Sequence, residues 1–311
     1  MSIADLEARA EAGDVEAQNE LGEIYELREE YVQAVYWYHR AAENGNSAAQ
    51  NQLAMMYYLG RGGVSKDNKK VLYWLRKSAE QENPKAQANL GAMYYIGECG
   101  LPEDKTQALY WYKKAAEQEE SYAQVQLGRM YYSGEGGLTT DKVKAVLLFR
   151  QSAEQGNPYG QDELGYAYYT GDCGLSEDKK QAAYWFSKSA EQENPDSQYM
   201  LGIMYLDGEG GLKWDPVKAR SLFQKSAEQG NPYAQAELGD MYYSGEHGLP
   251  EDKALADYWH RQAHKNPIYE QEEQAFSDFM MVMIITRTQK IRTFRCSEEN
   301  KLNREGKINF E

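Results

Sequence analysis

The chain has 311 residues and a formal net charge of −15, which argues against a general affinity for nucleic acid phosphates or anionic lipid. Its three cysteines are too few for a disulfide framework and indicate a reducing compartment. The N-terminus has no basic segment followed by an apolar core. We therefore expect a cytoplasmic protein, or a periplasmic or secreted one if a signal peptide has been removed. No apolar run is long enough to span a membrane.

Residues 1–13 precede a repeating pattern and are predicted to form an N-terminal capping helix. Residues 14–265 then contain seven repeats, each marked by a leucine that is followed by glycine in all but one case. From Leu53 onward the interval between these leucines is 37 residues, and the first interval is 32 residues. A fixed period in this range indicates stacked supersecondary units. The leucines are Leu21, Leu53, Leu90, Leu127, Leu164, Leu201 and Leu238.

Each repeat is predicted to fold as two helices. In the last repeat, Asn231 and Pro232 are a typical cap and first residue of a helix, and Gly245 breaks that helix. Asp252 can cap a second helix. A glycine in the middle of the first helix costs roughly 0.5–1 kcal/mol relative to alanine, so its recurrence predicts that the two helices cross closely there. The residues missing from the short first repeat fall between Leu21 and Trp37, where later repeats carry a glycine-rich loop.

The repeats resemble those of the Sel1-like repeat (SLR) family, relatives of the tetratricopeptide repeats. Residues 123–156 carry the family pattern at Ala123, Leu127, Gly128, Met130, Tyr131, Gly134, Gly136, Asp141, Lys144, Ala145, Ala153 and Gly156. The resemblance implies an all-α fold, a right-handed α/α superhelical solenoid in which the first helix of each pair lines a concave face. It also implies that the chain binds other proteins, and it transfers no catalytic residue. Cys99 and Cys173 lie in equivalent loops and lack the partners that some bacterial members pair within a repeat.

Two adjacent tyrosines end the first helix of most repeats. Neighbours on a helix point about 100° apart, so the two side chains cannot share one buried stripe. We interpret the first as core. The second lies on the concave face according to the family geometry, where tyrosine suits protein recognition, or it packs one repeat against the next. The second tyrosines are Tyr58, Tyr95, Tyr132, Tyr169 and Tyr243, and Leu206 and Glu26 fill the same position in two repeats.

Positions three and seven residues before the second tyrosine vary in chemistry, as a binding surface requires, and the middle repeats are the most aromatic. We predict no catalytic residue, metal site or cofactor. The candidate protein-binding residues are Tyr58, Tyr95, Tyr122, Val125, Arg129, Tyr132, Tyr159, Asp162, Tyr166, Tyr169, Tyr199, Ile203, Leu206 and Tyr243.

Other motifs do not indicate catalysis. His260 and His264 are four residues apart but lack the glutamate of a zinc protease motif, so we interpret them as solvent-facing. Ser176 and Lys179 have the spacing of penicillin-recognising enzymes, yet equivalent loops place proline at the serine position. Trp214 departs from the tryptophan spacing and is interpreted as covering adjacent helices, with an exposed anchor as the alternative.

Residues 266–290 are predicted to form a C-terminal capping helix, because a terminal repeat otherwise exposes its outer face, and residues 291–311 a loosely ordered tail. The sequence favours a monomeric, non-enzymatic scaffold that binds a protein or peptide in its concave groove. Its acidity suits a basic partner. One alternative is an immunity or inhibitor protein that neutralises a toxin or secreted effector, and another is a hydrolase of cell-wall or lactam substrates.

Overall fold

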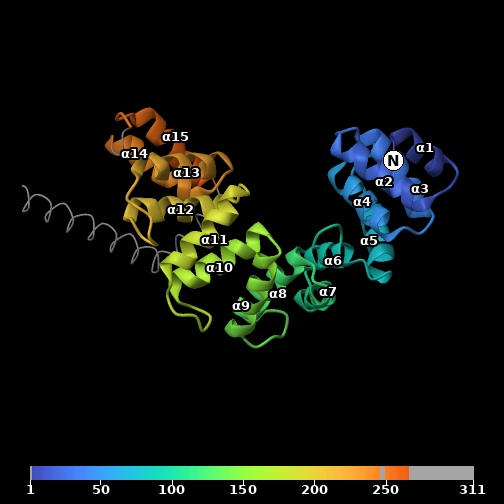
Figure 1. Cartoon of the computed structure of the whole chain (residues 1–311), viewed down its shortest axis with the longest axis horizontal. Coiled ribbons are helices and arrows are strands. Elements are labelled where there is room, and N and C mark those ends of the chain that lie inside the picture. The colour runs from blue at the N-terminus through green and yellow to red at the C-terminus, as the bar shows by residue number, and fades with distance from the viewer. Residues whose placement is uncertain (1, 246–248, 266–311) are drawn as a thin grey trace, which may run out of the picture. The chain divides into compact units, whose positions relative to one another are not determined.

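The structure, a computed structural model, describes residues 2–245 and 249–265. Those residues form 15 α-helices and no strand (Figure 1), which confirms the prediction of an all-α solenoid of helix pairs. The predicted capping helix at 266–290 and the tail at 291–311 lie outside the described residues. No helix in the described ranges is long and apolar enough to cross a membrane.

After α1 (Ile3–Glu11), the described helices form seven pairs, each with a first and a second helix. The first helices are α2 (Val15–Leu27), α4 (Ser47–Leu59), α6 (Pro84–Ile96), α8 (Ser121–Ser133), α10 (Pro158–Thr170), α12 (Pro195–Asp207) and α14 (Pro232–Ser244). The second helices are α3 (Tyr31–Glu43), α5 (Asn68–Glu80), α7 (Lys105–Glu117), α9 (Lys142–Glu154), α11 (Lys179–Glu191), α13 (Pro216–Glu228) and α15 (Lys253–His264).

The ends of these helices follow from local sequence. The side chain of Asn83 accepts a hydrogen bond from the Ala86 amide, and Pro84 occupies the first position of α6. Gly97 then ends α6 in the left-handed conformation, with φ of 70°. Asp104 caps α7 by accepting from two backbone amides. The same devices recur along the chain, so each 37-residue repeat forms one helical hairpin.

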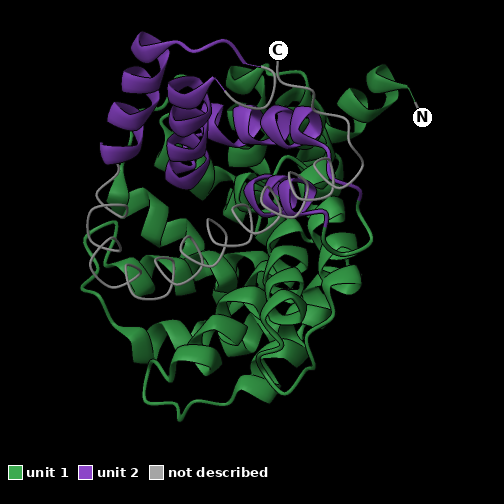
Figure 2. Ribbon diagram, turned by 90° about the vertical axis from the view of Figure 1, so that its left-hand side faces the viewer, with its two compact units in different colours: residues 1–197, 209–212 green, residues 198–208, 213–311 purple. Residues whose placement is uncertain are grey.

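The chain divides into two compact units (Figure 2). Unit 1 comprises residues 1–197 and 209–212, and unit 2 comprises residues 198–208 and 213–311. In unit 1, α1 to α11 pack consecutively, and first helices also contact one another, as α2 does α4 and α8 does α10. No two second helices in the described residues share contacts of that extent. Contacts between first helices, without contacts of that extent between second helices, are what the family geometry implies for first helices that line an inner side.

The recurrent glycine lies where a large ring of the second helix presses on the first. A Cβ atom added at Gly128 would lie 2.5 Å from the Phe149 ring, and one at Gly165 would lie 2.8 Å from the Phe186 ring. These distances leave no room for a methyl group, which confirms the predicted close crossing. One repeat has alanine, Ala54, in place of this glycine. In that repeat the residue of the second helix that is elsewhere a large ring is the smaller Leu75. Both rings are buried.

The first repeat is shorter because of its internal connection, as predicted. Only residues 28–30 separate α2 from α3, whereas residues 60–67 join α4 to α5.

Two side chains differ from their sequence interpretation. His260 is only partly exposed: it packs against Gly239 in the position that aromatic rings fill elsewhere, and it bonds Asp240 at 3.0 Å. Trp214 was expected to cover adjacent helices, but 65% of it is exposed. His260 can pack in this way because Gly239, which has no side chain, leaves room for its ring.

Candidate protein-binding surface

The second tyrosine of a pair connects two consecutive repeats. The hydroxyl of Tyr58 donates to Glu98 at 2.9 Å, that of Tyr95 to Glu135 at 2.7 Å, and that of Tyr132 to Asp172 at 2.8 Å. Each acceptor lies in the glycine-rich loop of the next repeat. This geometry supports the second of the two interpretations given for these residues, since the ring and its hydroxyl brace neighbouring repeats.

A lysine at the start of the second helix completes the connection. Lys142 pairs with Asp172 at 2.8 Å and lies over the Tyr132 ring, 4.7 Å from its centroid. The hydrogen bond from Lys142 lowers the pKa of Asp172. Lys105 pairs with Glu135 in the same way, at 3.1 Å. Burial, with the Glu135 bond, raises the pKa of Tyr95 to about 12.

The first tyrosine packs within its own repeat. Tyr57 and Tyr131 are buried, and each lies beneath a lysine of the second helix. The fifth repeat reverses this order, because Tyr169 is buried whereas Tyr168 is only partly so. Tyr169 lies under Lys179, 3.2 Å from the ring centroid, and beside Phe186. The interpretation of the first tyrosine as core therefore applies to Tyr57 and Tyr131 but not to Tyr94, Tyr168 or Tyr242, which are only partly buried.

The exposed candidates in unit 1 concentrate on α8 and α10, two first helices in contact. Tyr132 is 41% exposed and Tyr159 49%. Tyr166 and Arg129 are also exposed, and Arg129 pairs with Glu163 across the two helices at 2.5 Å. These side chains lie on two helices that are in contact and are joined by the Arg129–Glu163 pair, and we call them the α8–α10 surface. Its exposed or half-buried members are Tyr122, Arg129, Tyr132, Tyr159, Asp162, Glu163 and Tyr166.

The electrostatics of the α8–α10 surface centre on Asp162. Its carboxylate accepts a hydrogen bond from the Ser197 hydroxyl. Burial raises the pKa of Asp162 to about 7, an effect that Ser197 opposes and the neighbouring carboxylates of Asp196 and Glu163 reinforce. Burial lowers the pKa of Arg129, but the attraction of Glu163 outweighs it and the net shift is upward. The surface thus combines a fixed cation with carboxyl groups and tyrosine rings.

The structure does not bring all predicted residues to a surface. Five are buried and contribute packing in this structure, which corrects their assignment to an exposed concave face: Val125, Tyr169, Tyr199, Ile203 and Leu206. Val125 is fully buried. Tyr58 and Tyr95 are half-buried by their links to the next repeat, and Tyr122 lies against the buried Tyr112. Tyr243 is 61% exposed and belongs to unit 2.

Sequence reasoning missed a second row of tyrosines, on the second helices. Tyr73 and Tyr110 are about half exposed, and each ring meets the following tryptophan edge to face, with centroids 4.8 and 5.0 Å apart. A Tyr-Trp dipeptide that recurs in the sequence could have indicated this row of tyrosines. The remaining members in unit 1 are Tyr36 and Tyr184.

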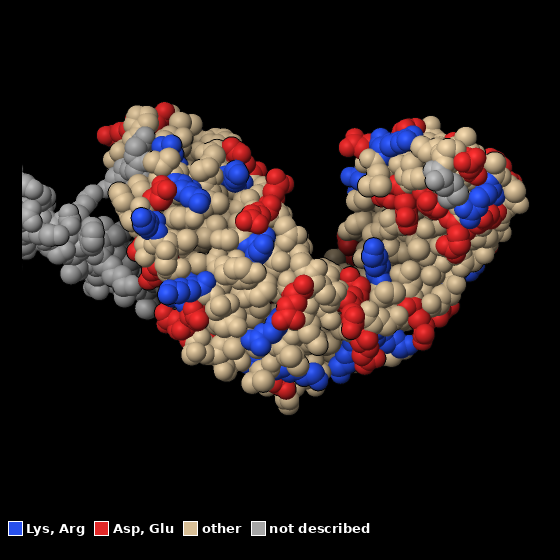
Figure 3. Space-filling model, viewed as in Figure 1, with Lys and Arg blue, Asp and Glu red and all other residues tan. Residues whose placement is uncertain are grey.

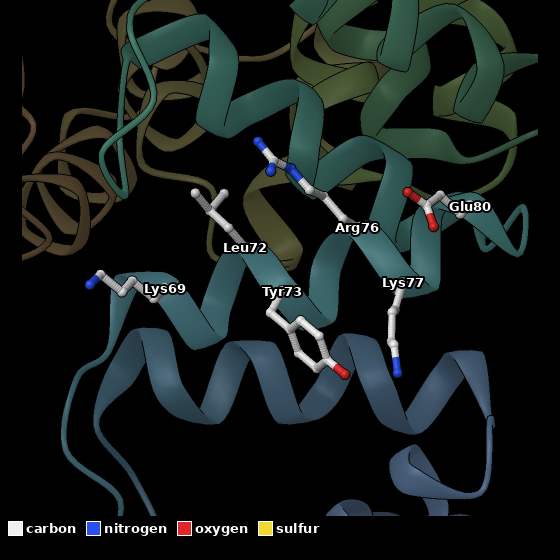
Figure 4. A pocket seen from close by; sticks show the side chains of 6 residues that line it. All are labelled: Lys69, Leu72, Tyr73, Arg76, Lys77 and Glu80. Carbon is white, nitrogen blue, oxygen red and sulfur yellow. The ribbon is translucent and has the colours of Figure 1, made fainter.

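Acidic and basic side chains both occur on the face of the molecule drawn in Figure 3. Among the described residues no three His, Cys, Asp or Glu side chains are grouped as a metal site would require. A surface depression on α5 is lined by residues of that one helix (Figure 4), an arrangement without convergent catalytic groups. Cys99 and Cys173 are buried free thiols.

Comparisons with known proteins agree with this architecture. The Sel1 repeat pattern matches seven consecutive segments, residues 15–46, 47–83, 84–120, 121–157, 158–194, 195–231 and 232–264. A Sel1 repeat protein from Oxalobacter formigenes is 29% identical, with a TM-score of 0.67 over 79% of this chain and 96% of that chain. A protective antigen present in uropathogenic Escherichia coli strains, which displays an SLR fold, is 31% identical, with a TM-score of 0.56 over 85% of this chain and 64% of that chain.

An immunity protein from Pseudomonas aeruginosa is also similar, at 22% identity and a TM-score of 0.47 over 68% of this chain and 81% of that chain. A comparison with curated proteins gave no match.

Proposed function

Since this chain belongs to the Sel1 repeat family, we propose that it is a non-enzymatic scaffold that binds a protein or peptide through the α8–α10 surface. Exposed side chains of varied chemistry on a regular, packed frame carry this proposal. Tyr159 and Tyr166 offer large rings that lose little conformational freedom on binding, and Arg129 offers a cation already oriented by Glu163. Such residues are enriched among those that dominate the energy of protein interfaces.

A basic partner suits this surface best. Asp162 and Glu163 lie on consecutive positions of α10, and only Arg129 balances them within the cluster. A lysine or arginine of the partner can approach the carboxyl groups while its aliphatic stem lies against a tyrosine ring. The acidity of the whole chain would speed the approach of such a partner.

A narrower version of the proposal is that the partner is a toxin or secreted effector whose activity the bound scaffold blocks. The net charge of −15 would attract a partner of this kind that is basic.

Capture of the partner tests the proposal. Tagged wild-type protein is used as bait in a lysate of the source organism, beside a variant with Tyr159→Ala and Tyr166→Ala. Tyr184→Ala on α11, also half exposed, serves as the matched control. We expect a protein that is recovered by the wild type and by the control and lost with the double variant. Equal recovery by all three baits would contradict a role for the α8–α10 surface.

A further inference from the structure

The second helices carry a charge opposite to that of the protein. Helices α5, α7, α9 and α11 together contain 13 Lys or Arg and four Asp or Glu, within a chain of net charge −15. The first helices α4, α6, α8 and α10 contain two of each kind. From α4 to α11, positive charge is therefore concentrated on the second helices, and more carboxylates lie in the loops than in the helices.

Three of these 13 cations form ion pairs within the described residues, and one of the three, Lys105, lies on α7. Lys105, Lys142 and Lys179 each form an ion pair with a carboxylate of the next loop. By contrast, no carboxylate among the described residues lies within ion-pair distance of a group of five cations on α5 and α7. These are Lys69, Arg76, Lys77, Lys113 and Lys114.

Two of the five cations lie over tyrosine rings. On α5, Lys77 lies over the ring of Tyr73, 4.9 Å from its centroid, and Tyr73 is held against Trp74. On α7, Lys114 lies 5.3 Å from the centroid of the Tyr110 ring. Figure 4 shows Tyr73 and Lys77 pointing to one side of α5 and Arg76 to the other. We call this set, with the five cations and the two tyrosines, the α5–α7 outer surface.

The two helices belong to consecutive repeats and both pack against α6. Their cations are placed by the helix period, since Tyr73 and Lys77 are four residues apart, as are Tyr110 and Lys114. The tyrosine rings give this surface an apolar part that is held in place by the adjacent tryptophans, and the cations give it a positive part.

We propose that the α5–α7 outer surface is a second docking site, for an acidic segment of a protein. This proposal goes beyond the function proposed above, because it concerns other helices and a partner of opposite charge. A peptide carrying spaced Asp or Glu side chains can pair with Lys77 and Lys114 while its apolar side chains cover Tyr73 and Tyr110.

The surroundings favour a protein over nucleic acid. Glu103 and Asp104 immediately precede α7, and Glu80 and Glu117 end the two helices. The positive surface is therefore bounded by carboxylates at both ends. Duplex DNA carries one charge per about 1.7 Å of its axis and would extend its phosphates over those carboxylates. An acidic peptide can place its charges only where the cations lie.

Binding of a fluorescein-labelled poly-glutamate peptide, followed by anisotropy at low and at physiological ionic strength, tests the proposal. The test variant is Lys77→Glu with Lys114→Glu. The control variant, Lys85→Glu with Lys213→Glu, changes two exposed lysines elsewhere and alters the net charge equally. We expect the test variant to bind about tenfold more weakly than the wild type or worse, and the control variant to stay within about twofold. Circular dichroism melts confirm that both variants are folded.

Three results would overturn the proposal. The first is wild-type protein that does not bind poly-glutamate at low ionic strength. The second is equal weakening by both variants, which would show that only net charge matters. The third is duplex DNA that binds the wild type more tightly than poly-glutamate does. If light scattering instead finds a wild-type dimer that the test variant dissociates, the surface is occupied by a second copy and the proposal is equally wrong.

Discussion

The hydroxyl of Tyr95 donates a hydrogen bond of 2.7 Å to the carboxylate of Glu135, 40 residues further along the chain. The same spacing separates Tyr58 from Glu98, and Tyr132 from Asp172. A tyrosine at the end of one first helix thus holds the loop of the following repeat. Because a repeat protein is stabilised by its nearest-neighbour interfaces, these bonds couple the folding of consecutive repeats.

Removing the Tyr95 hydroxyl should weaken that coupling. We expect Tyr95→Phe to lower the free energy of unfolding by about 1–3 kcal/mol, since a hydrogen bond to a charged group contributes about that much. The half-buried carboxylate of Glu135 would also lose one of its hydrogen-bond donors. Urea denaturation followed by circular dichroism measures the change. The matched control is Tyr243→Phe, whose ring is 61% exposed, and there we expect a change below about 0.5 kcal/mol. Equal effects in the two variants would show that the bond contributes nothing.

The contact between Gly165 and Phe186 predicts a compensating pair of substitutions. Gly165→Ala places a methyl group where a Cβ would lie 2.8 Å from the ring, and overpacking of this kind costs about 1–3 kcal/mol. Adding Phe186→Leu recreates the pair that Ala54 and Leu75 form in the second repeat. The double variant should therefore be more stable than the sum of the two single effects predicts, by about 0.5 kcal/mol or more. Thermal melts of the four proteins give the cycle, and strict additivity would contradict the contact.

The pKa of Asp162 predicts a dependence of stability on pH. A carboxyl group with a pKa raised from 3.8 to about 7 binds more protons in the folded than in the unfolded chain between those values, so its contribution to stability falls as the pH rises through that window. Asp162→Asn keeps an acceptor for the Ser197 hydroxyl and removes the charge. The variant should melt above the wild type at about pH 8, and the difference should shrink toward about pH 4. Arg129, Glu163 and Asp196 also act on the Asp162 carboxyl group. Parallel melts of Glu163→Gln measure the contribution of Glu163. A difference that does not change with pH would be inconsistent with this assignment.

The repeats and the helix ends could be predicted from the sequence because both depend on local chemistry. Caps such as Asn83 and the left-handed Gly97 act within a few residues, and the leucine spacing is visible without a structure. The close crossing at the mid-helix glycine was predictable for the same reason, since a costly residue that recurs implies a contact.

The role of the tyrosine pair depended on contacts between repeats and was predicted only in part. The acceptors of Tyr58, Tyr95 and Tyr132 lie 40 residues away, beyond any local pattern. The reversal in the fifth repeat has a physical cause in the second helix: Lys144, which covers Tyr131, is replaced at the corresponding position by Gln181. Tyr168 therefore lacks that cover, while Tyr169 packs beside the buried Phe186. Burial of Val125 likewise depends on neighbouring helices that a single helix pattern does not reveal.

The central claim is that a protein partner contacts the α8–α10 surface, and site-specific photo-crosslinking tests it most directly. A benzoylphenylalanine residue is placed at Tyr159 or Tyr166 on α10, and at Tyr184 on α11 as the control position. After irradiation with the captured partner, we predict a crosslinked product from the two α10 positions and none from Tyr184. Crosslinking from Tyr184 alone would place the partner on the second helices and would contradict the claim.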